Sequence, residues 1–200
     1  MPADHQHSPT THASIFLRLN TRDPKPREFA WSEFRERYAP IIGGFARKMG
    51  ARASDVEDIT QDVLTGFFAK SPTFVYDPSK GRFRGYLKTC TYHAVCNGLS
   101  HNARFKALPL SSLKESAPEV EAAWNDAWES AILKRSLESV REHFADGNTF
   151  RAFQQCVLED KDAVQVASDL GVSVRTVNRA KSRVLAMLRE RLRHLRDEAG

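Results

Sequence analysis

The stretch from Asp162 to Arg196 constrains the fold more than any other part of the chain. Its first part has apolar residues at helical spacing, which predicts a short helix with one buried face: Val164, Ala167 and Leu170. Gly171 then favours a tight turn, because glycine adopts the left-handed conformation at little cost. Ser173 is a good N-cap for a second helix, with inward positions predicted at Val174, Val177, Ala180, Val184 and Leu188. Two helices joined by such a turn form a helix-turn-helix.

The other face of the second helix is polar and basic. Between Val174 and Arg196 there are eight basic residues and one acidic residue, Glu190. Arg and Asn can pair with base edges in the major groove, and Ser and Thr suit phosphates. The candidate DNA contacts are Ser173, Arg175, Thr176, Asn178, Arg179, Ser182 and Arg183. The alternative is a solvated helix that is merely basic, but turn, cap, spacing and charge all favour duplex DNA binding.

Composition agrees with a polyanionic partner. The chain has 200 residues, enough for one or two small domains, with a net charge of +5 and a pI near 9.2. No apolar run reaches the roughly 18 residues of a membrane span, and the N-terminus does not resemble a signal peptide. Cys90, Cys96 and Cys156 fall in helical patterns without a CxxC spacing, which predicts buried free thiols in a reducing cytoplasm. Neither a metal site nor a cofactor is predicted.

Taken in order, the chain reads as all-α with two small helical domains. Residues 1–13 are predicted to be a disordered tail, and residues 14–106 a first domain. In that domain Arg22-Asp23-Pro24-Lys25-Pro26 separates a short helix from a long one that begins near Glu28. Residues 107–122 form an acidic, Pro- and Ser-containing linker, and residues 123–200 form a second domain that contains the helix-turn-helix.

An acidic helix follows the long one. Ser54 to Glu57 has the pattern of a capping box, and the inward positions of the helix it opens include Val56, Ile59 and Val63. Its outer side carries Asp55, Glu57, Asp58, Gln61 and Asp62. Acids in a first turn can simply complement the helix dipole, but Asp62 lies beyond that turn. Residues alone leave two readings open, a solvated face or a face that meets a basic partner.

The next segment mixes basic and aromatic residues. Ser71 to Gly81 is a loop with Phe74 and Tyr76, and a helix is predicted from about Phe83 to Ser100. Lys80 to Lys106 holds six basic residues and no acid, interleaved with aromatic rings. Cations for the backbone and rings for unstacked bases suit single-stranded nucleic acid. The alternative is that the rings, Phe83 and Tyr92 in particular, belong to the core.

Together these residues resemble the bacterial RNA polymerase sigma factors of the extracytoplasmic-function (ECF) group, in the sigma-70 family. Asp55-Val56-Glu57-Asp58-Ile59-Thr60-Gln61-Asp62-Val63 is similar to the family's DAEDLVQEV stretch. Phe74 followed by Gly81-Arg82-Phe83-Arg84-Gly85-Tyr86-Leu87 resembles its FxxxxGxFRxWL motif, and VASDLGVSVRTV resembles its IAxxLGxSxxTV motif. The resemblance covers about Ile15 to Leu195.

The resemblance implies a non-catalytic factor that binds core RNA polymerase and helps to melt promoter DNA. Core contacts, on the β′ clamp helices, would come from Asp55, Glu57, Asp58, Gln61 and Asp62. The −10 element would be held by Phe74, Tyr76, Lys80, Arg82, Arg84, Tyr86 and Lys88. The helix-turn-helix residues given above would read the −35 element, and the β flap is a further contact. Whether an anti-sigma factor binds the chain is left open.

Three departures from the family pattern and two rival interpretations remain. The first departure is Tyr86, which stands where the family usually has Trp and can still stack. His93 and Asn97 stand where the family commonly has Asn and Asp, and the second domain lacks the usual Leu-Pro start, so no promoter consensus is carried over. A helix-turn-helix regulator that binds operator duplex without polymerase explains the end of the chain but not the acidic helix or the basic-aromatic run. An enzyme using Asp58 and Asp62 as a carboxylate pair lacks a second acidic or His pair.

Overall fold

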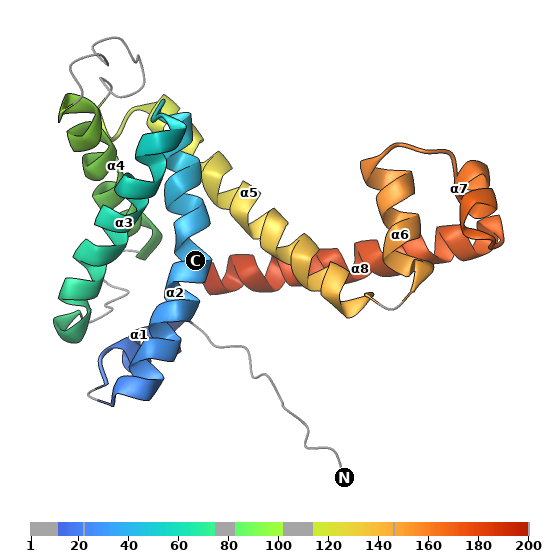
Figure 1. The fold of residues 1–200 in the computed structure, drawn as a ribbon, viewed down its shortest axis with the longest axis horizontal. Coiled ribbons are helices and arrows are strands. Elements are labelled where there is room, and N and C mark those ends of the chain that lie inside the picture. The colour runs from blue at the N-terminus through green and yellow to red at the C-terminus, as the bar shows by residue number, and fades with distance from the viewer. Residues whose placement is uncertain (1–11, 22, 75–82, 102–113, 146, 200) are drawn as a thin grey trace. The chain divides into compact units, whose positions relative to one another are not determined.

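The computed structural model describes residues 12–21, 23–74, 83–101, 114–145 and 147–199, and within them the chain forms helices and turns without a strand (Figure 1). The prediction of an all-α fold is therefore confirmed for this part of the chain. The chain divides into two compact units, which are described separately. Unit 1 runs from the N-terminus to Ala131, and unit 2 comprises Ile132–Asp197.

Unit 1 begins with a short helix and a long one, α1 (His12–Leu19) and α2 (Pro24–Lys48). The long helix starts four residues earlier than predicted from the sequence. Asp23 is its N-cap and accepts a hydrogen bond from the backbone N–H of Lys25. Pro24 takes the first helical position, where its fixed φ fits and its missing N–H costs nothing. The prolines therefore open α2, and the prediction that they interrupt the chain up to Glu28 was wrong.

Helices α2, α3 (Ala53–Lys70) and α4 (Phe83–His101) pack together through aromatic and aliphatic side chains. From α2 the buried stripe contributes Phe34, Tyr38, Ile41, Ile42 and Phe45, as its spacing predicts. Phe34 stacks on Phe67 of α3, with ring centroids 4.4 Å apart. A β-carbon on Gly43 would lie 3.2 Å from the Val56 side chain, so this glycine lets α2 and α3 approach closely.

The predicted capping box does not form. α3 begins at Ala53 with Arg52 as its N-cap and no side-chain cap. Ser54 therefore already lies in the first turn, and its hydroxyl donates to Asp55 Oδ1 at 3.0 Å. A box needs its serine in the non-helical position just before the helix, and here that position is two residues earlier.

The first half of α5 (Pro118–His143) belongs to unit 1. Val120, Trp124, Ala127 and Trp128 are all buried, and the Trp124 ring meets Phe45 of α2 edge-on at 5.2 Å. A β-carbon on Gly44 of α2 would lie 3.5 Å from the Ala127 side chain, so the two helices approach closely there. Lys48 of α2 forms an ion pair with Asp126 of α5. Residues 118–131 thus complete the core of this unit, although the sequence assigned 107–122 to a linker and 123 onward to the second domain.

Unit 2 contains the rest of α5, then α6 (Asn148–Phe153), a π-helical turn (Gln154–Leu158), α7 (Ala163–Leu170) and α8 (Val174–Ala199). One cluster joins α6, α7 and the start of α8: Ala152, Val166, Ala167, Val177 and Ala180. A second joins α5, α6 and the middle of α8: Val140, Phe153, Val184 and Leu188. Both clusters fix α8 by one side only, so its opposite side stays in solvent.

Most of the predicted tail, and the first seven residues of the predicted linker, lie outside the described residues. Residues 1–11 and 102–113 are not described, and the chain is helical from His12 and again from Pro118. The functional boundaries predicted from the sequence, 14–106 and 123–200, therefore stay predictions.

Candidate functional site

The outer face of α3 carries the predicted acidic residues. Glu57, Asp58, Gln61 and Asp62 are exposed, and Asp55 is half-buried. Among the described residues no ion pair is formed by Glu57, Asp58 or Asp62. Val56, Ile59 and Val63 turn to the core, as predicted, which fixes the rotation of the helix. We call the exposed carboxylates Glu57, Asp58 and Asp62 the acidic face of α3.

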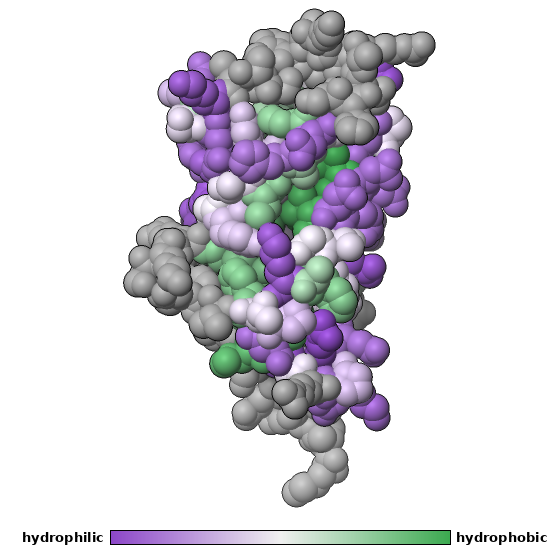
Figure 2. Space-filling model, turned by 90° about the vertical axis from the view of Figure 1, so that its left-hand side faces the viewer, coloured by the Kyte–Doolittle hydropathy of each residue, from purple (hydrophilic) through white to green (hydrophobic). Residues whose placement is uncertain are grey.

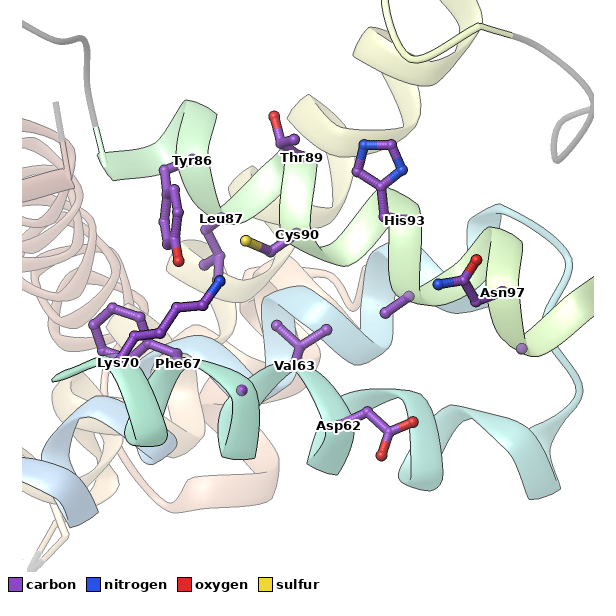
Figure 3. Close-up of a pocket in the computed structure, with 13 residues that line it drawn as sticks. Asp62, Val63, Phe67, Lys70, Tyr86, Leu87, Thr89, Cys90, His93 and Asn97 are labelled. Carbon is purple, nitrogen blue, oxygen red and sulfur yellow. The ribbon is translucent and has the colours of Figure 1, made fainter. Parts of the chain in front are cut away.

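A hollow of ≈ 610 Å³ lies between α3 and α4, next to Asp62. Figure 2 views the molecule from this side and shows apolar surface bordered by hydrophilic residues. From α3 come Val63, Gly66, Phe67 and Lys70, and from α4 Tyr86, Leu87, Thr89, Cys90, His93 and Asn97. In Figure 3 the Lys70 side chain extends toward α4, while Tyr86 directs its hydroxyl toward α3. The hollow thus joins an apolar floor to a cation and several hydrogen-bonding groups.

Tyr86 is the aromatic wall of this hollow. Its ring centroid lies 5.5 Å from that of Phe74, 5.9 Å from that of Phe83 and 6.4 Å from that of Phe67. The inner side of the ring therefore belongs to an aromatic cluster. Burial, and next a hydrogen bond with the Cys90 side chain, raises the pKa of Tyr86 from 10.0 to about 12. The phenol is therefore neutral near pH 7 and can stack or donate a hydrogen bond.

The other predicted aromatic residues behave differently. The Phe74 ring is half-buried and belongs to the same cluster. Its centroid lies 5.4 Å from that of Phe16 and 5.3 Å from that of Phe67. Phe83 and Tyr92 are buried, so for them the core alternative is confirmed. Burial and a hydrogen bond with Cys96 raise the pKa of Tyr92 as well. Tyr76, Lys80 and Arg82 lie outside the described residues.

Arg84 and Lys88 point away from the hollow, toward α5. Arg84 donates to Asn125 Oδ1 at 2.6 Å, and its guanidinium lies 4.8 Å from the centroid of the Trp128 ring. Lys88 forms an ion pair with Glu121, and its Nζ lies 3.9 Å from Glu115 Oε1. The predicted −10 contacts on α4 therefore do not lie together. Tyr86 lines the hollow, whereas the side chains of Arg84 and Lys88 contact α5.

In unit 2 the predicted turn is confirmed. Gly171 has φ +65° and ends α7, and its N–H donates to the carbonyl of Ser168. Ser173 caps α8 by accepting from the N–H of Thr176 at 3.1 Å. Val166 rather than Val164 is buried on α7: the inward set is Ala163, Val166, Ala167 and Leu170, and the assignment of Val164 to that face was wrong. Val174 is likewise 37% exposed rather than inward.

All seven candidate DNA contacts of this unit are exposed: Ser173, Arg175, Thr176, Asn178, Arg179, Ser182 and Arg183. Three of them, Ser173, Thr176 and Arg183, have intramolecular partners. Thr176 lies 2.9 Å from Ser173, hydroxyl to hydroxyl, and Arg183 lies over the Phe144 ring at 5.5 Å. We call these residues the basic face of α8.

Comparison with known proteins finds a match for the segment that carries the acidic face of α3. A family model described as sigma-70 region 2 matches residues 34–105, a range that includes the acidic face of α3 and the hollow beside it. This segment of the chain is similar to sigma-70 region 2. The ECF RNA polymerase sigma factor RpoE of Cereibacter sphaeroides is 27% identical over 115 residues, which are 58% of this chain. Those residues span 62% of the relative's length, and no solved structure matches the chain.

The matched segment also contains Lys70, which the sequence analysis did not select, and His93 and Asn97, whose contact with bases it left open. Lys70 lines the hollow with Tyr86, and His93 and Asn97 are exposed on the same side of α4. The spacing of Tyr86, His93 and Asn97, seven and then four residues, could have placed them on one helix face. Glu115 and Glu121 could not have been found from local pattern, because their partners lie on another helix.

Other kinds of site are less well supported by the described residues. No group of three or more His, Cys, Asp or Glu residues in them could hold a metal ion. The three cysteines are free thiols, but they are half-buried rather than buried as predicted. None of the helices searched is both long and apolar enough to cross a membrane.

Proposed function

We propose that this protein is an ECF-type sigma factor that gives core RNA polymerase its promoter specificity and promotes DNA melting, without catalysing a reaction itself. The observation that carries the proposal is the acidic face of α3, which is exposed, forms no ion pair among the described residues and lies in a segment that matches sigma-70 region 2. The named relative is an ECF sigma factor, which supports the same assignment.

The acidic face of α3 is the proposed contact with polymerase, on the β′ clamp helices. Glu57, Asp58 and Asp62 project from a helix whose opposite side is locked into the core, so they form a rigid row of charge. Complementary charge across an interface speeds encounter and fixes register. Gln61, exposed between Asp58 and Asp62, adds a hydrogen-bonding group to the row.

The hollow and the segment 71–84, which leads into α4, are the proposed binding region for the melted −10 strand. Base–aromatic stacking is worth about 1–3 kcal/mol per base, which is comparable to the few kcal/mol that unstacking costs. Tyr86 offers an aromatic wall, Lys70 a cation, and His93 and Asn97 exposed polar edges. Phe74 packs against the Tyr86 ring, with ring centroids 5.5 Å apart. Capture of bases here would favour the open duplex.

The basic face of α8 is the proposed reader of the −35 element. Arg175, Asn178 and Arg179 are exposed on the first turns of the helix, directly after the capped turn. A helix placed in the major groove contacts base edges through such N-terminal residues. The exposed apolar residues Val157 and Leu158, outside the two clusters of unit 2, are available for a polymerase contact such as the β flap.

Run-off transcription tests the proposal. Core polymerase from the native host is incubated with a promoter library, with and without the full-length protein. We expect new transcripts only when both are present, and we expect promoter DNA to open in permanganate footprints. A footprint on duplex DNA without polymerase, together with no new transcript, would instead support the rival regulator.

A further inference from the structure

We propose that Glu115 and Glu121 act as built-in mimics of nucleic-acid phosphate, so that an incoming strand has to displace their carboxylates from α4. This inference rests on the proposed binding of promoter DNA by α4. It concerns the edge of the hollow, where the lining residues Thr89 and His93 also lie against Glu115, and it gives a role to the acidic segment that precedes and opens α5.

The two carboxylates engage a cation and hydroxyl group that would otherwise suit a phosphate. Glu121 pairs with Lys88, and Glu115 Oε1 lies 3.9 Å from the same Nζ. The Thr89 hydroxyl donates to Glu115 Oε1 at 2.7 Å, and His93 Nε2 lies 3.9 Å from Glu115 Oε2. Lys, Thr and His side chains that converge on one anion resemble the groups that hold a DNA phosphate.

The arrangement hides Lys88 more than it hides the acids. The Lys88 side chain is only 13% exposed, whereas Glu115 is 31% and Glu121 45% exposed. A phosphate therefore cannot reach the lysine while both carboxylates stay in place. The carboxylates themselves are partly exposed, so water can hydrate them once they leave Lys88.

The helix that carries the acids is firmly held, so the exchange takes place at the level of side chains. Trp124 and Trp128 are 1% and 2% exposed, and Ala127 lies against Gly44. Detaching this face would return two large aromatic side chains to water, at a cost far above that of one surface ion pair. Glu115 precedes α5, and Glu121 lies in its first turn, next to this anchored face.

The consequence is weaker non-specific binding by the free protein. A strand that engages Lys88 must first break its contact with a carboxylate, and any strand bound nearby also meets that negative charge. Because both contributions are electrostatic, they weaken as the salt concentration rises. The free protein would thus bind stray single strands less than its cationic α4 suggests.

The test compares two glutamates in the same turn of α5. Glu121→Gln removes the partner of Lys88, whereas Glu119→Gln removes the same charge from an exposed residue that has no ion pair among the described residues. Binding of a fluorescent mixed-sequence DNA single strand to the full chain is measured by anisotropy at low ionic strength. We expect Glu121→Gln to bind about threefold more tightly than Glu119→Gln. Glu115→Gln, an independent variant, should also bind more tightly, and thermal melting verifies that each variant folds.

The difference should disappear at high salt and in a Lys88→Gln background, where the carboxylate has no cation to hold. Equal affinities for Glu119→Gln and Glu121→Gln would overturn the inference and leave the proposed function intact. Weaker binding by Glu121→Gln would also overturn it, because the carboxylate would then position Lys88 for the strand. If no variant binds single strands, alone or with core polymerase, strand binding by α4 fails and the inference fails with it.

Discussion

Replacing Trp128 by alanine should strongly destabilise unit 1. The ring is 2% exposed, it lies 6.2 Å from Tyr38 and 5.8 Å from Trp124, and Arg84 covers it at 4.8 Å. Truncation of a buried Trp or Phe to Ala costs about 3–5 kcal/mol, and loss of the cation–π contact adds about 0.5–1 kcal/mol. We therefore expect the free energy of unfolding to fall by about 4 kcal/mol, a large share of the 5–15 kcal/mol typical of a domain.

Intrinsic fluorescence in urea measures this loss, because the three tryptophans of the chain, Trp31, Trp124 and Trp128, all lie in unit 1. Phe29→Ala is the matched control. Its ring also has an arginine over it, Arg18 at 5.7 Å, but it is 66% exposed, so it should cost less than about 1 kcal/mol. If Trp128→Ala were no more destabilising than Phe29→Ala, residues 118–131 would not belong to the core of unit 1.

Three further predictions concern the turn, the tyrosine and the basic face. Gly171→Ala should destabilise unit 2 by about 1 kcal/mol, because alanine is strained at φ +65° even though no atom crowds the position. Gly66 is equally uncrowded but helical, so Gly66→Ala should slightly stabilise the protein. Thermal melting measures both changes. The raised pKa of Tyr86 means that the fold favours the neutral phenol. Its contribution to stability is intact below pH about 10 and is lost as the pH rises to about 12, so Tyr86→Phe should remove one late-titrating group from the ultraviolet titration and reduce alkaline destabilisation. Arg179→Ala should weaken binding of a −35 duplex by holoenzyme about tenfold and relax its sequence preference. Arg189→Ala, which removes the same charge further along α8, should weaken all duplexes equally and modestly.

Sequence patterns predicted those features that depend on residues close together in the chain. The rotation of α3 follows from Val56, Ile59 and Val63 at helical spacing, and the turn at Gly171 follows from its conformational freedom. The errors were local ambiguities. On α7 both Val164 and Val166 are apolar, and only packing against α8 decides which one is buried.

The partners of Arg84 and Lys88 could not be predicted in this way. Their contacts, with Asn125 and Glu121, join residues 41 and 33 positions apart, across a segment whose composition reads as a linker. A basic residue in a run of basic and aromatic residues has the same local signature whether it faces solvent or a neighbouring helix. Only the packing of Trp124 and Trp128 in the core of unit 1 brings Asn125 within reach of Arg84 and Glu121 within reach of Lys88.

The central claim is that the acidic face of α3 binds core RNA polymerase, and affinity for that enzyme tests it most directly. The double variant Asp58→Lys/Asp62→Lys is compared with Glu36→Lys, which reverses an exposed charge of α2 in the same unit. Like charges across an interface cost several kcal/mol, so the double variant should bind core at least about tenfold more weakly while melting like the wild type. Glu36→Lys should bind nearly as well as the wild type. Undiminished binding by a folded Asp58→Lys/Asp62→Lys protein would contradict the account.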